Sequence, residues 1–157
     1  MAKPKRIGHL VLNVKDVEAS TKFYTEILGF EISPQRPDGS GTFLTCGKIH
    51  HDLALFKAPE DAAPVTPGGL GLNHFAVQVE DLDALKEVYH TLQEQGVPIQ
   101  RTTDHNMTKS VYFHDPDGNA IEFIDFQGIG DITQPDYQDR ERRRAKSHLQ
   151  GKAAAEG

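Results

Sequence analysis

Two histidines stand at matching positions in two similar segments of this 157-residue chain. Segments 8–16 and 73–81 each alternate apolar and polar residues as a β-strand does, and their histidines, His9 and His74, lie 65 residues apart. Similarity at a fixed spacing indicates that one structural unit is built twice. Because neutral imidazole is the commonest metal ligand, the repeated histidine predicts a metal ion held between the two units.

A third ligand candidate, Glu122, lies in the last strand-like segment before the tail. On a strand it shares a face with Ala120 and Ile124, and burying an unpaired carboxylate among apolar side chains is costly unless it binds a metal or a partner. A single histidine is more often a hydrogen-bonded core residue, and a single glutamate more often faces water. The matched positions favour a metal, because His9, His74 and Glu122 form the open two-histidine, one-carboxylate set of non-haem Fe(II) sites.

The elements that would position these ligands follow one order twice. The first half predicts a strand, a helix ended by Gly29 and three further strands, at 7–14, 16–28, 30–33, 42–46 and 52–57. The second half repeats that order, with a helix ended by Gly96 and a turn at 115–118, at 72–79, 81–94, 97–101, 109–114 and 120–126. We therefore predict an α+β fold of two tandem βαβββ modules, whose sheets form a curved, partly open, barrel-like surface around the metal.

Domain boundaries follow from the same pattern. A single domain is predicted at residues 6–127, with module one at 6–57, a linker rich in Pro, Ala and Gly at 58–71, and module two at 72–127. Residues 128–157 form a charged extension, predicted to be helical over 134–152. The extension could dock on a partner subunit, and we expect a homo-oligomer, although its arginine-rich run is more typical of a solvated helix face.

Charge and composition exclude several classes of function. The net charge is −6, and because residues 139–157 carry +3, the rest carries −9, which disfavours nucleic acid as a partner. No apolar run approaches the ~20 residues of a membrane span, and the N-terminus lacks the apolar stretch of a signal peptide. Cys46 is the only cysteine, so no internal disulfide can form, which suits a reducing cytoplasm. We expect a cytoplasmic protein with a small-molecule ligand and no membrane partner.

These residues resemble the vicinal oxygen chelate superfamily, which includes glyoxalase I, methylmalonyl-CoA epimerase, fosfomycin-resistance transferases and type I extradiol dioxygenases. The resemblance covers about residues 6–127. Fold alone does not select the activity. Glyoxalase-like and epimerase-like sites typically add a carboxylate from the last strand of module one. Here 53–55 aligns with 121–123, so Ala54 stands at that place, and the three remaining ligands are the number found in the dioxygenases and the fosfomycin enzymes.

The residues around the ligands resemble those of two-module extradiol, or catechol 2,3-, dioxygenases. His51 opens a segment like the one that carries their catalytic histidine, and His105, Tyr112, the 115–118 turn and Glu122 follow the spacing of their ring-cleavage signature. The resemblance implies a catechol-type diol and dioxygen as substrates and Fe(II) as the metal, although Mn(II) supports similar geometry. It implies an acid–base role for His51 and hydrogen bonds from His105 and Tyr112 to substrate oxygens.

Alternatives stay open at this point. His50 could replace His51 as the catalytic histidine, His105 could cap a loop, and Tyr112 could pack in the core. A fosfomycin-type thiol transferase should gather basic residues for a phosphonate, and only Lys48, Arg101 and Lys109 lie near the motifs. Another glyoxalase-fold enzyme, or a non-catalytic ligand-binding protein of bleomycin-resistance type, would share the fold, although the latter generally lacks the triad. The sequence does not identify the ring substituents of the substrate.

Overall fold

The structure is a computed structural model that describes residues 2–33, 40–105 and 108–126. The predicted tail helix at 134–152 lies outside these residues, as does most of the predicted loop at 34–41. Within them, the element order confirms the duplicated βαβββ pattern and the α+β class. No helix in the described ranges is long and apolar enough to span a membrane.

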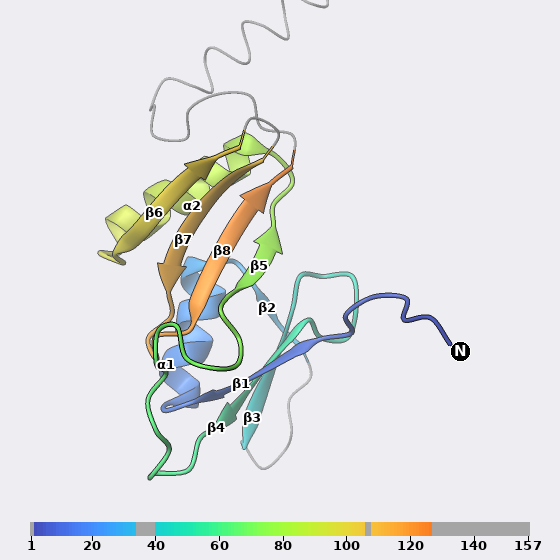
Figure 1. Ribbon diagram of the computed structural model, residues 1–157, viewed down its shortest axis with the longest axis vertical. Helices are drawn as coiled ribbons and strands as arrows, with labels where there is room; N and C mark the ends of the chain where they lie inside the picture. The colour runs from blue at the N-terminus through green and yellow to red at the C-terminus, as the bar shows by residue number, and fades with distance from the viewer. Residues whose placement is uncertain (1, 34–39, 106–107, 127–157) are drawn as a thin grey trace, which may run out of the picture.

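Each module contributes one four-stranded sheet (Figure 1). Module one holds the strands β1 (Leu10–Val14), β2 (Glu31–Ile32), β3 (Gly41–Thr45) and β4 (Leu53–Lys57). Module two holds β5 (Phe75–Gln78), β6 (Ile99–Asp104), β7 (Lys109–His114) and β8 (Ala120–Asp125). The spatial orders are β1-β4-β3-β2 and β5-β8-β7-β6, so the two sheets have the same topology and do not close into a barrel.

The strand registers show that the two modules are equivalent residue by residue. In each module the first strand pairs in parallel with the last, and the registers include Val11 with Ala54 and Ala76 with Glu122. Since Val11 and Ala76 are separated by the repeat distance of 65 residues, Ala54 and Glu122 occupy the same place in the two sheets. The sequence alignment that matched Ala54 with Glu122 is therefore confirmed by register.

Each helix begins at an aspartate in the same repeat position. The Asp16 side chain accepts a hydrogen bond from the Ala19 amide at 3.0 Å, and Asp81 accepts one from Ala84 at 2.9 Å. An aspartate at this position satisfies an amide that the helix start leaves without a partner. The helices that follow are α1 (Val17–Lys22) and α2 (Leu82–Glu94).

The first helix differs from the uninterrupted helix that we predicted at 16–28. It changes after Lys22 into a π-helical segment, η1 (Phe23–Ile27). The Thr21 and Thr25 hydroxyls donate to the carbonyls of Val17 and Thr21, and such bonds compete with the regular backbone pattern. This local competition offers a physical reason for the wider turn.

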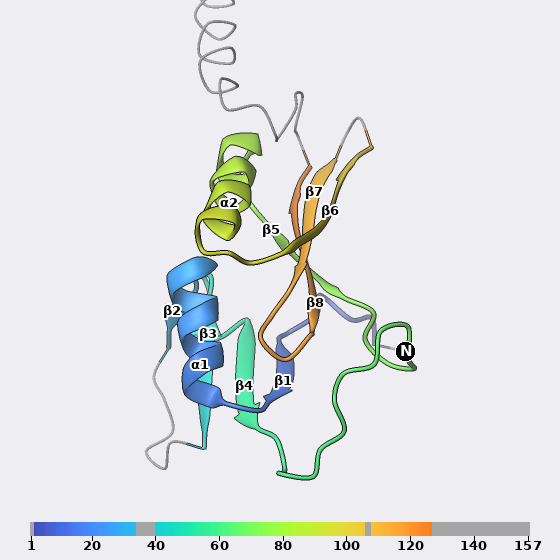
Figure 2. The same cartoon turned by 90° about the vertical axis from the view of Figure 1, so that its left-hand side faces the viewer.

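Both helices lie on the same side of the sheets, and the core lies between them and the strands (Figure 2). On β8, Ile121 and Phe123 are buried in the same cluster as Leu85 and Leu92 of α2. Because side chains alternate along a strand, Glu122 lies on the opposite face, away from α2. Neither α1 nor α2 therefore covers the face that carries the predicted ligand (Figure 2).

A buried hydrogen bond joins the two modules. The Tyr24 hydroxyl in η1 donates to Asp115 Oδ2 at 2.9 Å, in the turn between β7 and β8. Asp115 also accepts bonds from the backbone amides of Asp117 and Asn119 and from the Asn119 side chain. The predicted turn at 115–118 therefore also anchors module one.

Candidate metal centre and active site

The imidazole of His74 meets the carboxylate of Glu122 on the helix-free face of module two. His74 Nε2 lies 3.1 Å from Glu122 Oε2, and His74 Nδ1 lies 2.7 Å from the side-chain oxygen of Asn73. Glu122 is only 7% exposed. Asn73 therefore fixes the ring with Nε2 directed at the carboxylate, as outer partners do for metal-binding histidines. Two of the three predicted metal ligands are in direct contact.

Tyr112 completes this group. It is directly opposite Glu122 in the register of β7 and β8, and its hydroxyl donates to Glu122 Oε1 at 2.6 Å. Its ring meets the ring of His74 edge to face, with 5.7 Å between the centroids. Tyr112 therefore does not pack in the core but touches both predicted ligands of module two.

The electrostatics of this group favour an ionised carboxylate. Burial by itself raises the pKa of Glu122, but hydrogen bonds from Ser110 and Tyr112 and the nearby imidazole of His74 outweigh it, so the pKa is lowered. The pKa of the Tyr112 phenol is raised, first by burial and then by its bond to Glu122. A negative carboxylate beside a neutral phenol is a suitable environment for a divalent cation.

The histidines of module one form a second group. His9 lies just before β1, and its ring centroid is 4.5 Å from that of His51, which precedes β4. His51 Nδ1 lies 2.9 Å from His50 Nδ1. Burial lowers the pKa of His51, and the neighbouring His9 and His50 lower it further. A neutral imidazole is the form that can accept a proton, which suits the role predicted for His51.

The structure does not gather the three predicted ligands into one site. His74 and Glu122 are together, whereas His9 packs against His51 on the other sheet. Within the described part of the chain, no three His, Cys, Asp or Glu side chains are grouped to hold a metal. The residues present fit a metal in chemistry, because an ionised, buried carboxylate and an oriented imidazole already converge. His9, the third predicted ligand, lies beside His51 on the sheet of module one.

His105 stands apart from both groups. It is exposed at the end of β6, and its backbone amide donates to the Thr108 carbonyl at 2.9 Å. Residues 106 and 107 beside it lie outside the described ranges. Its predicted contact with substrate stays a prediction.

Sequence reasoning gave no role to Arg101. Its guanidinium carbon lies 4.1 Å from the centroid of the Tyr112 ring. The contact depends on a register shift between Ile99 and Arg101 in the pairing of β6 with β7. The alternation of apolar and polar residues does not reveal a β-bulge of this kind. The sequence therefore showed that a basic residue lies near the motif, but not that it contacts Tyr112.

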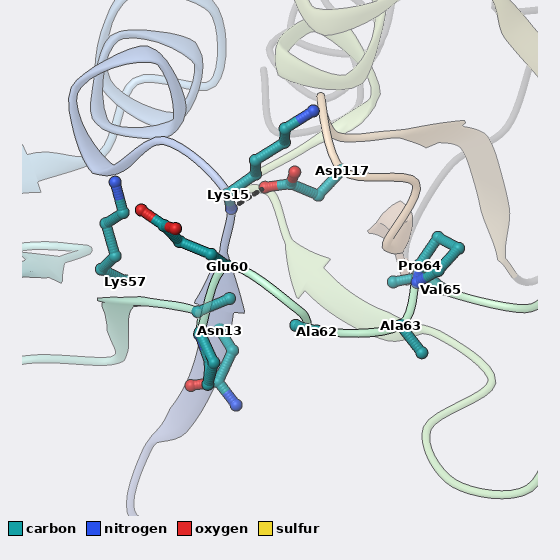
Figure 3. A pocket seen from close by; sticks show the side chains of 11 residues that line it. Asn13, Lys15, Lys57, Glu60, Ala62, Ala63, Pro64, Val65 and Asp117 are labelled. Carbon is teal, nitrogen blue, oxygen red and sulfur yellow. Dashed lines mark hydrogen bonds between the residues drawn. The ribbon is translucent and has the colours of Figure 1, made fainter.

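The linker lines a hollow elsewhere on the molecule (Figure 3). It measures about 490 Å³ and lies between residues 57–65 and the end of β1. Lys15, Lys57 and Glu60 border it, and the backbone amide of Lys15 donates to Asp117 Oδ2 across it at 3.1 Å. None of the predicted ligands or catalytic residues lines this hollow, so it is separate from the candidate site.

Fold and site together define a duplicated βαβββ protein with a histidine–carboxylate–phenol group on an uncovered sheet face. The chain belongs to the glyoxalase/bleomycin resistance protein/dioxygenase superfamily, whose profile it matches over residues 6–123. It is similar to biphenyl-2,3-diol 1,2-dioxygenase 3 of Rhodococcus globerulus, with 34% identity over 78% of this chain and 64% of that protein. The chain thus spans less than two thirds of that relative's length.

Solved structures place the fold in the same superfamily. A glyoxalase/dioxygenase from Nostoc punctiforme superposes with a TM-score of 0.68 and 26% identity, covering 76% of this chain and 90% of the other. The fosfomycin resistance protein FosX of Listeria monocytogenes, in complex with Mn(II), superposes with a TM-score of 0.64 over 83% of this chain and 98% of that one. At 18% identity, the second likeness concerns the fold alone.

Proposed function

We propose that this protein is an extradiol dioxygenase that cleaves a catechol-type diol with dioxygen at an Fe(II) site. The observation that carries the proposal is the contact of Tyr112 and His74 with the buried carboxylate of Glu122. These residues stand at the positions that the ring-cleavage signature assigns to them, in a chain similar to a named diol dioxygenase. Mn(II) remains the alternative metal.

In this proposal, His9, His74 and Glu122 hold the metal. The bound metal would supply a Lewis acid with open positions for both diol oxygens and for dioxygen. Asn73 orients His74, and Ser110 keeps Glu122 ionised. Tyr112 hydrogen-bonds a substrate oxygen with its phenol, and His105 contacts the substrate from the end of β6. His51, with its lowered pKa, accepts and returns a proton as a general acid–base.

A homo-oligomer forms part of the proposal, because the ligand set is divided between two sheets. β1 and β5 are each the outer strand of their sheet, and such edges are open to pairing with another strand. If β1 of a second copy approaches β5, its His9 reaches His74 and Glu122. The exposed single thiol of Cys46 agrees with residence in a reducing cytoplasm.

Subunit mixing tests how the site is completed. His9→Ala and Glu122→Ala chains each lack one ligand, and we expect neither to retain iron alone. Co-refolded in equal amounts, they should regain part of the iron content and activity, because a shared site can take His9 from one chain and Glu122 from the other. Failure to regain either would place all three ligands in one chain.

The reaction itself is tested by anaerobic reconstitution with Fe(II), followed by a panel of catechols and air. We expect oxygen uptake and a yellow ring-cleavage product. His51→Ala should retain iron and lose most turnover, whereas a rate equal to that of the parent protein would refute the acid–base role. No uptake with any catechol, together with thiol transfer to fosfomycin, would instead identify a transferase.

A further inference from the structure

Arg101 places a positive charge on the face of the Tyr112 ring. The guanidinium carbon is 4.1 Å from the ring centroid, within the range of a cation–π contact. The hydroxyl of the same ring donates to Glu122 Oε1. Tyr112 thus contacts Arg101 through its ring and the predicted metal ligand Glu122 through its hydroxyl.

The backbone of β6 is shaped to bring Arg101 to this place. Ile99 pairs with Phe113, yet Arg101 and not Gln100 pairs with Tyr112, so one extra residue is inserted in β6. Without the bulge, the neutral amide of Gln100 would lie opposite Tyr112. Bulges redirect side chains and occur frequently beside active sites.

No carboxylate among the described residues forms an ion pair with Arg101. Arg101 is exposed. The neighbouring Lys109 is paired with Asp104 on the same two strands, and Glu122 is already held by Tyr112 and His74. The guanidinium of Arg101 contacts Tyr112 through the ring and a side-chain hydrogen bond, and with no carboxylate partner among the described residues it can bind an anion from outside.

We propose that Arg101 forms a subsite for an anionic substituent, so that the preferred substrates are aromatic diols carrying a carboxylate. This inference rests on the proposed function and names the substrate class for that site. Guanidinium binds carboxylate through two parallel hydrogen bonds, and those bonds are stronger than bonds between neutral groups. The ring of Tyr112 holds the guanidinium in place, so little side-chain entropy is lost on binding.

The test compares matched substrates on the iron-loaded protein. The wild type should turn over 3,4-dihydroxybenzoate with at least tenfold higher kcat/KM than its uncharged methyl ester. Arg101→Gln should lower kcat/KM for the acid by about tenfold or more, mainly by raising KM. It should change kcat/KM for the ester by no more than about twofold. For the acid, Arg101→Lys should have a kcat/KM between those of the wild type and Arg101→Gln. Lys57→Gln, which removes a cation at the separate hollow, is the control and should change neither substrate.

A second measurement separates this inference from the proposed function. Calorimetric binding of 3,4-dihydroxybenzoate and of its methyl ester to the wild type and to Arg101→Gln requires no turnover. A preference for the acid that is lost in Arg101→Gln supports the subsite, even if no diol is cleaved. Equal effects of the substitution on acid and ester, or no effect on either, would overturn it. The proposal would also be overturned if fosfomycin bound in a way that depends on Arg101 while neither diol was preferred. The anion bound by Arg101 would then be a phosphonate.

Discussion

The two modules share one backbone plan and differ sharply at one place on it. In module two, Glu122 lies opposite Tyr112 and receives the hydrogen bond of its phenol. In module one, the equivalent Ala54 lies opposite Phe43, which has no hydroxyl to donate. Both sheets keep a histidine ahead of their first strand, yet among the described residues His74 meets a carboxylate and His9 packs against His51. The same backbone plan thus carries a buried carboxylate in module two and an alanine in module one, while the strand register stays the same.

Removing the carboxylate of module two should have the largest effect on metal binding. Glu122→Ala should weaken iron retention by more than about 100-fold, because even partners of ligands cost 10–100-fold when lost. Metal content after dialysis measures the effect. Glu87→Ala, at an exposed glutamate of α2, is the control and should retain iron like the wild type. Full iron content in Glu122→Ala would show that module two does not hold the metal.

The converse experiment adds a carboxylate to module one. Ala54 is 1% exposed, and in Ala54→Glu a charge is buried opposite Phe43, which lacks the hydroxyl that Tyr112 offers Glu122, so the free energy of unfolding should fall by about 3–5 kcal/mol. Adding Phe43→Tyr should restore about 1 kcal/mol through a new hydrogen bond. Urea denaturation of both single variants and the double variant measures this coupling. Ala54→Leu controls for size, and an Ala54→Glu protein no less stable than Ala54→Leu would contradict the argument.

Tyr24 and Tyr89 occupy the same repeat position in the two modules. Tyr24 is fully buried and donates to Asp115. The half-buried Tyr89 accepts a long hydrogen bond of 3.4 Å from Gln93 and meets the ring of His90 edge to face. Burial and the negative charge of Asp115 also raise the pKa of Tyr24, so it remains a donor. Tyr24→Phe should cost about 1–2 kcal/mol of unfolding free energy, and Tyr89→Phe less than about 0.5 kcal/mol. Equal losses in urea denaturation would refute a special role for the module junction.

The smallest expected effect concerns pH. Because the pKa of Glu122 in the folded protein lies below its ordinary value of 4.5, its carboxylate stabilises the metal-free fold fully above about pH 4.5, and this contribution is lost as the pH falls through the lowered pKa. The stability difference between the wild type and Glu122→Gln should therefore shrink from pH 5 to pH 3. Thermal unfolding in the presence of chelator measures it, and a difference that does not change with pH would exclude this assignment.

Most of the fold was predictable from the sequence, because its signals are local. The alternation in 109–114 matches β7 residue for residue, and the aspartate ahead of α2 is its cap. The modules and the equivalence of Ala54 with Glu122 followed from the repeat. The conversion of α1 into η1 did not, since threonine bonds within a helix leave no trace in its apolar spacing.

The candidate site was predictable only in part. The contacts among His74, Tyr112 and Glu122 agree with the spacing of the motif. The contact of His9 with His51, and not with His74, could not be predicted, because it depends on how two sheets are placed relative to each other. The contact of Arg101 depends on a one-residue bulge. Side-chain chemistry can be read from a sequence, but strand register and the packing of one sheet against another follow from the whole chain.

The anchoring of Asp115 has a consequence for how this lineage can change. Asp115 lies in the segment that resembles the ring-cleavage signature, yet its oxygens accept hydrogen bonds from Tyr24, Asp117 and Asn119. Selection to keep the two halves joined would preserve it in a descendant whose Glu122 had been replaced and whose chemistry had ended. An aspartate kept at this turn would thus be explained by assembly alone, and inheritance of activity has to be judged at the carboxylate four residues after the turn.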